Sequence, residues 1–176
     1  NYVSFDGTPF GISTYETTPR GITFSNDGTK MYVVGTSGDE VNQFALTTPF
    51  ETTSGITADG IFGGLSNPNS IVFNNDGTKM YTINNVGFIY QYSLSVPFDI
   101  NTAPTSDGNI DISLDGAATR GLCFNHDGSL LYVVNETDDE VNQYTVTTPF
   151  DLTAGISSAT PFDISGETTQ PQDIAF

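Results

Sequence analysis

Residues 24–34 read FSNDGTKMYVV, residues 73–83 read FNNDGTKMYTI, and residues 124–134 read FNHDGSLLYVV. The chain therefore carries one stretch three times, and its last four residues, DIAF, match the start of a further copy. The Asp-Gly pair in each copy supplies the positive backbone dihedral angles that a tight hairpin turn requires. Each copy therefore predicts two antiparallel strands joined by a turn, the second of them rich in Tyr and β-branched residues.

The phenylalanines that begin these copies are 49, 51 and 52 residues apart, at Phe24, Phe73, Phe124 and Phe176. A period near fifty residues is typical of a propeller blade. A third strand follows each hairpin (EVNQFAL, FIYQYSL or EVNQYTV) and ends at a Pro-Phe corner. The fourth segment is rich in Gly, Asp and Ser, as suits a solvated outer edge strand. We predict an all-β fold, a β-propeller built of four-stranded antiparallel blades.

The repeats predict a single β-propeller array over residues 1–176, with whole blades at 18–66, 67–117 and 118–168. Residues 1–17 end like the third repeat and are expected to form the outer strand of a preceding blade. Residues 169–176 are expected to form the inner strand of a next blade. Three blades leave two apolar faces without a neighbour. We therefore expect further blades, from a longer natural polypeptide or from neighbouring subunits.

The charge is strongly acidic, with 21 Asp and Glu against 4 Lys and Arg and a formal net charge of −17. Nucleic acid as a partner is excluded on this ground, because binding it requires a basic patch that neutralises phosphates. No apolar run is long enough to cross a membrane, so we expect no membrane insertion. The single cysteine, Cys123, leaves no internal disulfide to form.

The stretches DGTKMYVV and DGSLLYVV resemble the repeats of the YVTN and lactonase-like β-propeller family, in which a DG hairpin leads into a Tyr-Val strand. The resemblance covers essentially the whole chain and implies the propeller fold. Such repeats occur in lactonases, sensor domains, surface adhesins and virion proteins, so the fold alone does not assign a function. The threonine-rich corners LTTPFETTSG and VTTPFDLTAG look like those of secreted arrays, which implies an extracellular, cell-surface or virion-surface location.

The position four residues before each repeat phenylalanine varies while its surroundings repeat, as a ligand-reading position would. In a propeller of this kind it lies at the mouth of the central channel, and here it holds Arg20, Asn69, Arg120 and Gln172. The loop between the second and third strands supplies rim carboxylates on the same face, namely Asp39, Glu40, Asp138, Asp139 and Glu140. This mouth predicts a site for a small anionic or sugar-like ligand or a partner protein. The alternative is that each arginine braces the blades through a carboxylate pair.

Asp107, Asp111 and Asp115 recur at a spacing of four, and carboxylate oxygens suit Ca²⁺. Their spacing differs from that of an EF-hand loop, so a solvated strand edge is the alternative. We expect no other cofactor. His126 replaces an asparagine in a hairpin turn and is interpreted as a turn residue. Cys123 takes a small-residue position of an inner strand and is interpreted as packing.

Lactonase-like members of the resembling family rely on clustered acidic, Arg or His groups, or a metal, at the mouth. In this chain only Arg20 and Arg120 match, and we expect no acidic or histidine partner on the inner strands. The sequence therefore favours a non-catalytic extracellular or virion-surface module for protein or carbohydrate binding or structural assembly. One alternative is a lactonase-like hydrolase whose catalytic groups lie on blades outside this chain. Another is a purely architectural subunit.

Overall fold

The computed structural model describes residues 9–116 and 118–176. Its first two sheets each have four antiparallel strands in chain order. The first sheet, called blade 1 below, contains β1 (Pro19–Phe24), β2 (Lys30–Gly35), β3 (Glu40–Leu46) and β4 (Ile56–Gly63). Blade 2 contains β5 (Pro68–Phe73), β6 (Lys79–Asn84), β7 (Phe88–Ser93) and β8 (Thr105–Asp111), with the short 3₁₀ helix η1 (Ile100–Thr102) between β7 and β8.

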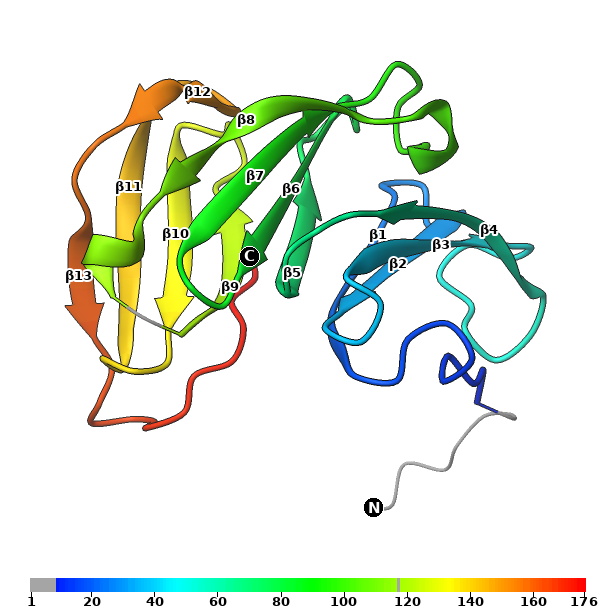
Figure 1. Cartoon of the computed structure of the whole chain (residues 1–176), viewed down its shortest axis with the longest axis horizontal. Helices are drawn as coiled ribbons and strands as arrows, with labels where there is room; N and C mark the ends of the chain where they lie inside the picture. Colours follow the sequence, from blue (N-terminus) through cyan, green and yellow to red (C-terminus); the bar gives the residue numbers. More distant parts are fainter. Residues whose placement is uncertain (1–8, 117) are drawn as a thin grey trace.

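Blade 3 follows the short 3₁₀ helix η2 (Ser113–Asp115) and has the same order, but its outer strand is split. It contains β9 (Thr119–Phe124), β10 (Leu130–Asn135), β11 (Glu140–Thr148), β12 (Asp151–Ile156) and β13 (Thr160–Asp163). Both β12 and β13 pair with β11. Figure 1 shows the three blades side by side with their inner strands β1, β5 and β9 towards a common centre. The predicted antiparallel hairpins and four-strand units are thereby confirmed.

The blade boundaries 18–66, 67–117 and 118–168 stay a prediction, and the three sheets lie within them. Residues 1–8 and 117, to which two of the predicted ranges extend, lie outside the described residues. The flanking strands differ from expectation, because residues 9–17 and 169–176 form no strand. A strand needs a neighbouring strand to pair with, and no described residue supplies one to either segment. No helix of the described ranges is long and apolar enough to cross a membrane.

The last residues nevertheless lie where the inner strand of a next blade would lie. A Cβ on Gly21 of β1 would come within 2.9 Å of the Cα of Ser70 on β5, and a Cβ on Gly121 of β9 would come within 2.8 Å of the Cα of Asp173. Glycine at both positions permits this close approach of the neighbouring backbone. The segment around Asp173 thus lies against β9 as β5 lies against β1, and Figure 1 shows it returning to the centre.

Residues near the amino terminus cover the opposite end of the array. Phe10 packs edge-on against Phe44 of blade 1 with ring centroids 5.5 Å apart, and Phe62 of blade 1 packs in the same way against Tyr92 of blade 2 at 5.1 Å. Residues 10–15 therefore take part of the place that the outer strand of a preceding blade would occupy. They leave Ile22 of β1 59% exposed.

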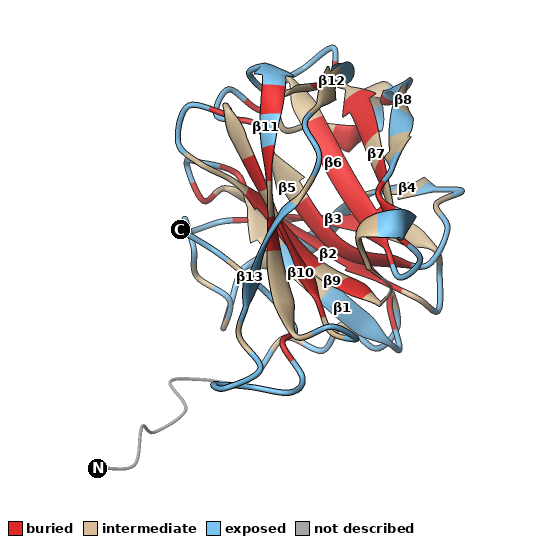
Figure 2. Ribbon diagram, turned by 90° about the vertical axis from the view of Figure 1, so that its left-hand side faces the viewer, coloured by how far each residue is buried: buried red, intermediate tan, exposed pale blue. Residues whose placement is uncertain are grey.

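The core lies between the blades, where the faces of neighbouring sheets meet. One cluster joins Tyr32, Val34 and Val41 of blade 1 to Ile71 and Met80 of blade 2. A second cluster joins blades 2 and 3 in the same way. Figure 2 shows buried residues along the central strands, whereas β1 and β13, at the two ends of the array, are largely exposed. Burial of apolar area between blades is the main stabilising contribution, because neither face of a single blade is shielded without a neighbour.

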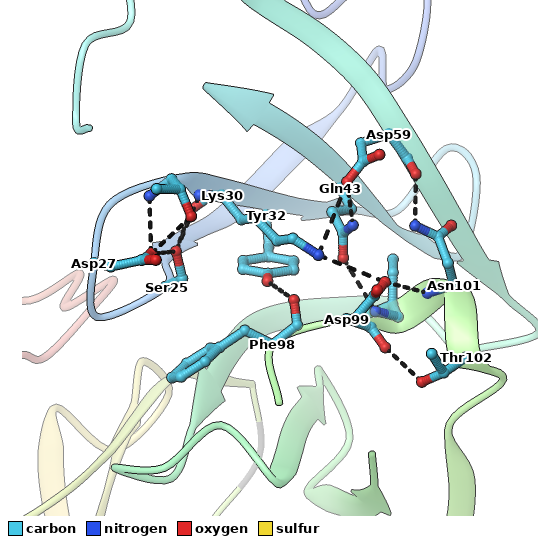
Figure 3. Close-up of polar contacts among 12 residues, drawn as sticks. Ser25, Asp27, Lys30, Tyr32, Gln43, Asp59, Phe98, Asp99, Asn101 and Thr102 are labelled. Carbon is cyan, nitrogen blue, oxygen red and sulfur yellow. Dashed lines mark hydrogen bonds and ion pairs between the residues drawn. The ribbon is translucent and has the colours of Figure 1, made fainter. Parts of the chain in front are cut away.

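Two hydrogen bonds connect blade 1 to the Pro-Phe corner of blade 2, as Figure 3 shows. The hydroxyl of Tyr32 donates to the carbonyl of Phe98, and the backbone N–H of Ile100 donates to the side-chain oxygen of Gln43 at 3.0 Å. Lys30 adds an ion pair to Asp99 of the same corner at 3.5 Å. The corner itself follows from Phe98, whose φ of 54° turns the chain sharply after Pro97.

Candidate functional site

The four residues predicted to read a ligand converge on one cavity of about 220 Å³. Arg20, Asn69, Arg120 and Gln172 all line it, together with Pro19 and Asp173. The structure therefore brings together side chains that are spread over more than 150 residues of sequence. They meet because each stands near the start of an inner strand or, for Gln172, of the segment that lies beside β9.

A local irregularity in each inner strand directs these side chains. The pairing register of β1 with β2 shifts between Pro19 and Gly21, which leaves Arg20 as the extra residue. The same shift between Pro68 and Ser70 leaves Asn69 extra on β5, and β9 carries an irregularity around Arg120. A bulge re-aims one side chain out of the alternating pattern of a strand. The repeated irregularity thus presents one variable side chain per blade to the cavity.

The two arginines of the cavity differ in their partners. Arg120 forms an ion pair with Glu136, which lies in the β10–β11 loop of the same blade. Arg20 makes no ion pair with any residue that the structure describes, whereas Lys30, Lys79 and Arg120 each make at least one. The ion pair of Arg120 lies within blade 3, so it does not join neighbouring blades as the alternative interpretation of the arginines expects. The guanidinium donors of Arg20 have no carboxylate partner within residues 9–116 and 118–176, and the side chain lines the cavity.

Two further side chains give the cavity its polarity. Asn69 is buried and donates from its amide nitrogen to the carbonyl of Thr119 at 2.8 Å, which fixes blade 2 against blade 3. Asp173 contributes a carboxylate to the lining. Asp173 lies outside the strands and makes no ion pair with either arginine among the described residues, so the expectation that the inner strands carry no acidic partner stays a prediction. Asp173 begins the run DIAF, and its position in that repeated run was the signal that could have identified it.

The rim carboxylates do not line the cavity that contains Arg20 and Arg120. Asp39 and Asp139 have φ angles of 51° and 52° and form the turns between the second and third strands of their blades. The Asp39 carboxylate accepts the N–H of Asn67 at 2.8 Å, and that of Asp138 accepts the amide of Asn135 at the same distance. Asp138 and Glu140 line a separate depression beside η2, and Glu40 lies at the start of β3. Asp39 and Asp138 therefore stabilise these loops, whereas one carboxylate oxygen of Asp139 is buried and has no hydrogen-bond partner among the described residues.

The three calcium candidates have different partners. Asp107 binds Lys79 at 3.2 Å and accepts hydrogen bonds from Gln91 and Ser93. Burial opposes ionisation of Asp107, but these donors and the lysine charge together hold its pKa below the usual value. Asp111 accepts the N–H of Ser113, and Asp115 accepts the hydroxyl of Tyr144. No cluster of three or more metal-ligating side chains occurs within residues 9–116 and 118–176, and calcium binding stays a prediction.

His126 and Cys123 lie at the hairpin end of the inner strands, away from the arginines. Both line a larger cavity of about 440 Å³. Asn26 donates to the carbonyl of Asn75, and Asn75 donates to the carbonyl of His126 at 2.6 Å, so the turns of successive blades are linked. Burial raises the pKa of Cys123 to about 11, with the Asp173 charge adding to the effect. A thiol that stays protonated is a weak nucleophile, which agrees with its interpretation as packing.

Sequence reasoning missed Glu16, a carboxylate that is only 1% exposed. It accepts the N–H groups of Thr18 at 2.6 Å and Gly38 at 3.3 Å and the hydroxyl of Ser37. Burial opposes its ionisation, but these donors outweigh that effect and lower its pKa. Glu16 thereby connects the segment before β1 to the β2–β3 loop next to the mouth. Glu16 lies in the stretch YETTPR and does not recur at the equivalent position of the other repeats, so the repeat pattern did not identify it.

This arrangement defines the class of protein: three antiparallel blades around a common axis, with one variable side chain per blade at the mouth, form part of a β-propeller. No protein-family model matches the chain, and no curated protein matches it either. Solved structures match it at low identity, and the resemblance to YVTN repeats in particular has no support beyond the sequence stretches that suggested it.

The chain is similar to a putative 6-phosphogluconolactonase from Bacteroides uniformis, at 18% identity and a TM-score of 0.58 over 89% of this chain and 44% of that one. It is similar to the periplasmic gluconolactonase of Pseudomonas aeruginosa, at 16% identity and 0.60 over 83% and 40%. It also matches Kuenenia stuttgartiensis hydrazine synthase, at 14% identity and 0.62 over 98% and 42%. The chain thus spans less than half the length of these proteins. At such identities the likeness shows the β-propeller fold and leaves the activity open.

Proposed function

We propose that this chain is a non-catalytic binding module whose mouth cavity takes a small anionic, sugar-like ligand. The observation that carries the proposal is the convergence of one variable side chain from each repeat on a single cavity in which Arg20 has no ion-pair partner among the described residues. A guanidinium presents a fork of donors that matches a carboxylate or phosphate group. Asn69, Gln172 and Asp173 would orient the hydroxyl groups of such a ligand.

The test is calorimetric titration of the protein with gluconate and, as an uncharged match of the same chain length, glucitol. We expect gluconate to bind and glucitol to bind at least about tenfold more weakly, because a charge-assisted hydrogen bond is worth about 1.5–3 kcal/mol. Arg20→Gln should remove the preference. Lys79→Gln removes the same charge at the opposite end of the strands and should leave binding unchanged. Equal affinity for the two probes, or no effect of Arg20→Gln, would contradict the proposal.

A lactonase-like hydrolase is the second candidate, and Asp173 is the observation that favours it. A carboxylate beside two arginines could activate water while a guanidinium stabilises the oxyanion that forms on a lactone carbonyl. Of the similar structures, one is described as a putative 6-phosphogluconolactonase and another as a periplasmic gluconolactonase. Hydrolysis of glucono-δ-lactone faster than the spontaneous rate, abolished by Asp173→Asn and by Arg20→Gln, would establish this candidate over the non-catalytic module.

The location of the protein and its partner are part of the same proposal. We place the module outside the cell or on a virion surface, with a protein or carbohydrate partner, because its corners are threonine-rich and its net charge is −17. The native protein should then occur in culture supernatant or in purified particles. Its presence only in the soluble lysate of intact cells would contradict this setting. Loop faces buried entirely against copies of the chain would instead indicate the architectural subunit.

A further inference from the structure

The two interfaces between blades use the same hydrogen bonds in the same direction. From blade 1, Tyr32 donates to the carbonyl of Phe98 on blade 2, and Gln43 accepts the N–H of Ile100. From blade 2, Tyr81 donates to the carbonyl of Phe150 on blade 3, and Gln91 accepts the N–H of Leu152 at 2.8 Å. In both cases a Tyr-Gln pair on the middle strands holds the Pro-Phe corner of the next blade.

Blade 3 carries the same pair in the same register. Tyr132 lies opposite Gln143, as Tyr32 lies opposite Gln43 and Tyr81 opposite Gln91. Neither the Tyr132 hydroxyl nor the Gln143 amide forms a hydrogen bond with any residue in the described ranges, although both equivalents in the other blades do.

The surroundings of this pair form an open apolar cavity of about 430 Å³, lined in part by Tyr132, Val141, Gln143, Phe162 and Phe176. Phe162 is 68% exposed, while its counterpart Phe62 on blade 1 packs on Tyr92 of the next blade. Phe176 already lies on Tyr132 with centroids 5.0 Å apart, as Phe73 lies on Tyr32 at 4.6 Å. The segment that ends at Phe176 therefore occupies the place of the inner strand of a next blade. The place that the Pro-Phe corner of that blade would take is open.

We propose that this face of blade 3 receives the remaining strands of a fourth blade of the same repeat. The Phe carbonyl of its Pro-Phe corner accepts the Tyr132 hydroxyl, and the N–H two residues later donates to Gln143. The bound strands pair with the segment that ends at Phe176. One feature is specific to this junction: Leu130 stands where Lys30 and Lys79 stand, so no lysine is present to pair with an acidic residue in the corner.

The test extends the chain after Phe176 with a copy of residues 125–168, which continue the repeat after the equivalent Phe124. Tyr132→Phe is then compared in the extended and the 176-residue proteins. We expect it to lower the melting temperature of the extended protein by about 2–6 °C, and we expect Tyr81→Phe to do the same in the original chain, because in each case a buried carbonyl loses its donor. In the original chain the same change should have no measurable effect, since no residue of 9–116 or 118–176 accepts a hydrogen bond from the Tyr132 hydroxyl.

Leu130→Lys is the second variant. It restores the lysine opposite the acidic residue of the appended corner, and should raise the melting temperature of the extended protein only. An extension with residues 74–117 from blade 2 repeats the experiment with a different corner. If Tyr132→Phe leaves both extended proteins unchanged, or if the appended strands stay protease-sensitive, the proposal is overturned. A dimer of the original chain that Tyr132→Phe already destabilises would identify a second copy as the occupant and overturn it as well.

Discussion

Tyr32 and Phe98 are 66 residues apart in sequence, and the hydroxyl of the first donates a hydrogen bond to the carbonyl of the second across the boundary of two blades. Burial of Tyr32 and the nearby Asp99 charge raise the pKa of the phenol, so the hydroxyl stays protonated as a donor at neutral pH. The bond thus fixes the distance and register between sheets that apolar contacts alone would leave able to slide.

Replacing Tyr32 by Phe should lower the free energy of unfolding by about 1–3 kcal/mol, because the carbonyl of Phe98 would remain buried without a donor. Thermal and urea unfolding measure the change. Tyr90→Phe is the matched control, since no hydrogen bond of the Tyr90 hydroxyl occurs among the described residues. Equal losses in the two variants would show that the hydroxyl of Tyr32 adds nothing specific.

Replacing Glu16 by Gln should destabilise the protein at pH 7 by about 1–3 kcal/mol, because a charge-assisted acceptor of several donors is lost. The folded-state pKa of Glu16 is lowered from 4.5, so its contribution is present above the unfolded pKa and is lost as pH falls through the folded pKa. The gap between the two unfolding curves should therefore shrink below about pH 4.5. Glu167→Gln, on an exposed residue, should show no such gap at any pH.

Replacing Gly77 by Ala should cost about 2 kcal/mol or more. Its φ is 71°, which L side chains rarely adopt, and a Cβ there would come within 2.1 Å of the Phe98 ring. Gly11→Ala serves as the control, because a Cβ at Gly11 meets nothing within 4 Å. The prediction fails if both variants unfold at the temperature of the wild type.

The Cys123 thiol should resist modification in the native protein. It is buried, and burial raises its pKa to about 11, so little thiolate is present at pH 8. Labelling with a chromogenic disulfide reagent should be at least about a hundredfold slower in the native protein than in the urea-unfolded protein. Rapid native labelling at pH 8 would instead point to an accessible, activated cysteine.

The sequence predicted the hairpins and the repeat because the Asp-Gly turns and the apolar runs are local signals. It also located Arg20, Asn69, Arg120 and Gln172, since equivalent positions of a repeat meet around one axis. It could not assign Glu136 as the partner of Arg120, because the equivalent position of the blade 1 loop holds Thr36, so the repeat pattern gives no signal for the pairing. Glu16 was missed for the same reason. Glu136 and Glu16 are residues that occur once and do not recur at equivalent positions of the repeats.

For the rim carboxylates, the sequence predicted the position but not the role. Sequence placed Asp39 and Asp139 on the correct loops but could not separate a turn residue from a ligand-binding one. Their positive φ angles are what make aspartate suitable there, since short polar side chains tolerate the left-handed region. The flanking segments were expected as strands from their alignment, yet they lack neighbours for pairing. Alignment of the repeats predicts where a segment lies, but a strand also requires a neighbouring strand for hydrogen bonding, which the alignment does not provide.

Six hydrogen bonds between blades join side chains on one side to main-chain atoms on the other: the carbonyls of Phe98, Phe150, Asn75 and His126, and the N–H groups of Ile100 and Leu152. Main-chain atoms are the same in every residue apart from the missing N–H of proline. At these six bonds each blade recognises the backbone of its neighbour, while the apolar contacts between blades still depend on residue type. A gene segment that encodes one blade can therefore be duplicated or exchanged, and the residues that contribute only main-chain atoms can change, while these hydrogen bonds between blades are kept. The array is thus well suited to change its length during evolution, one blade at a time, while the single variable side chain at each mouth position diverges freely.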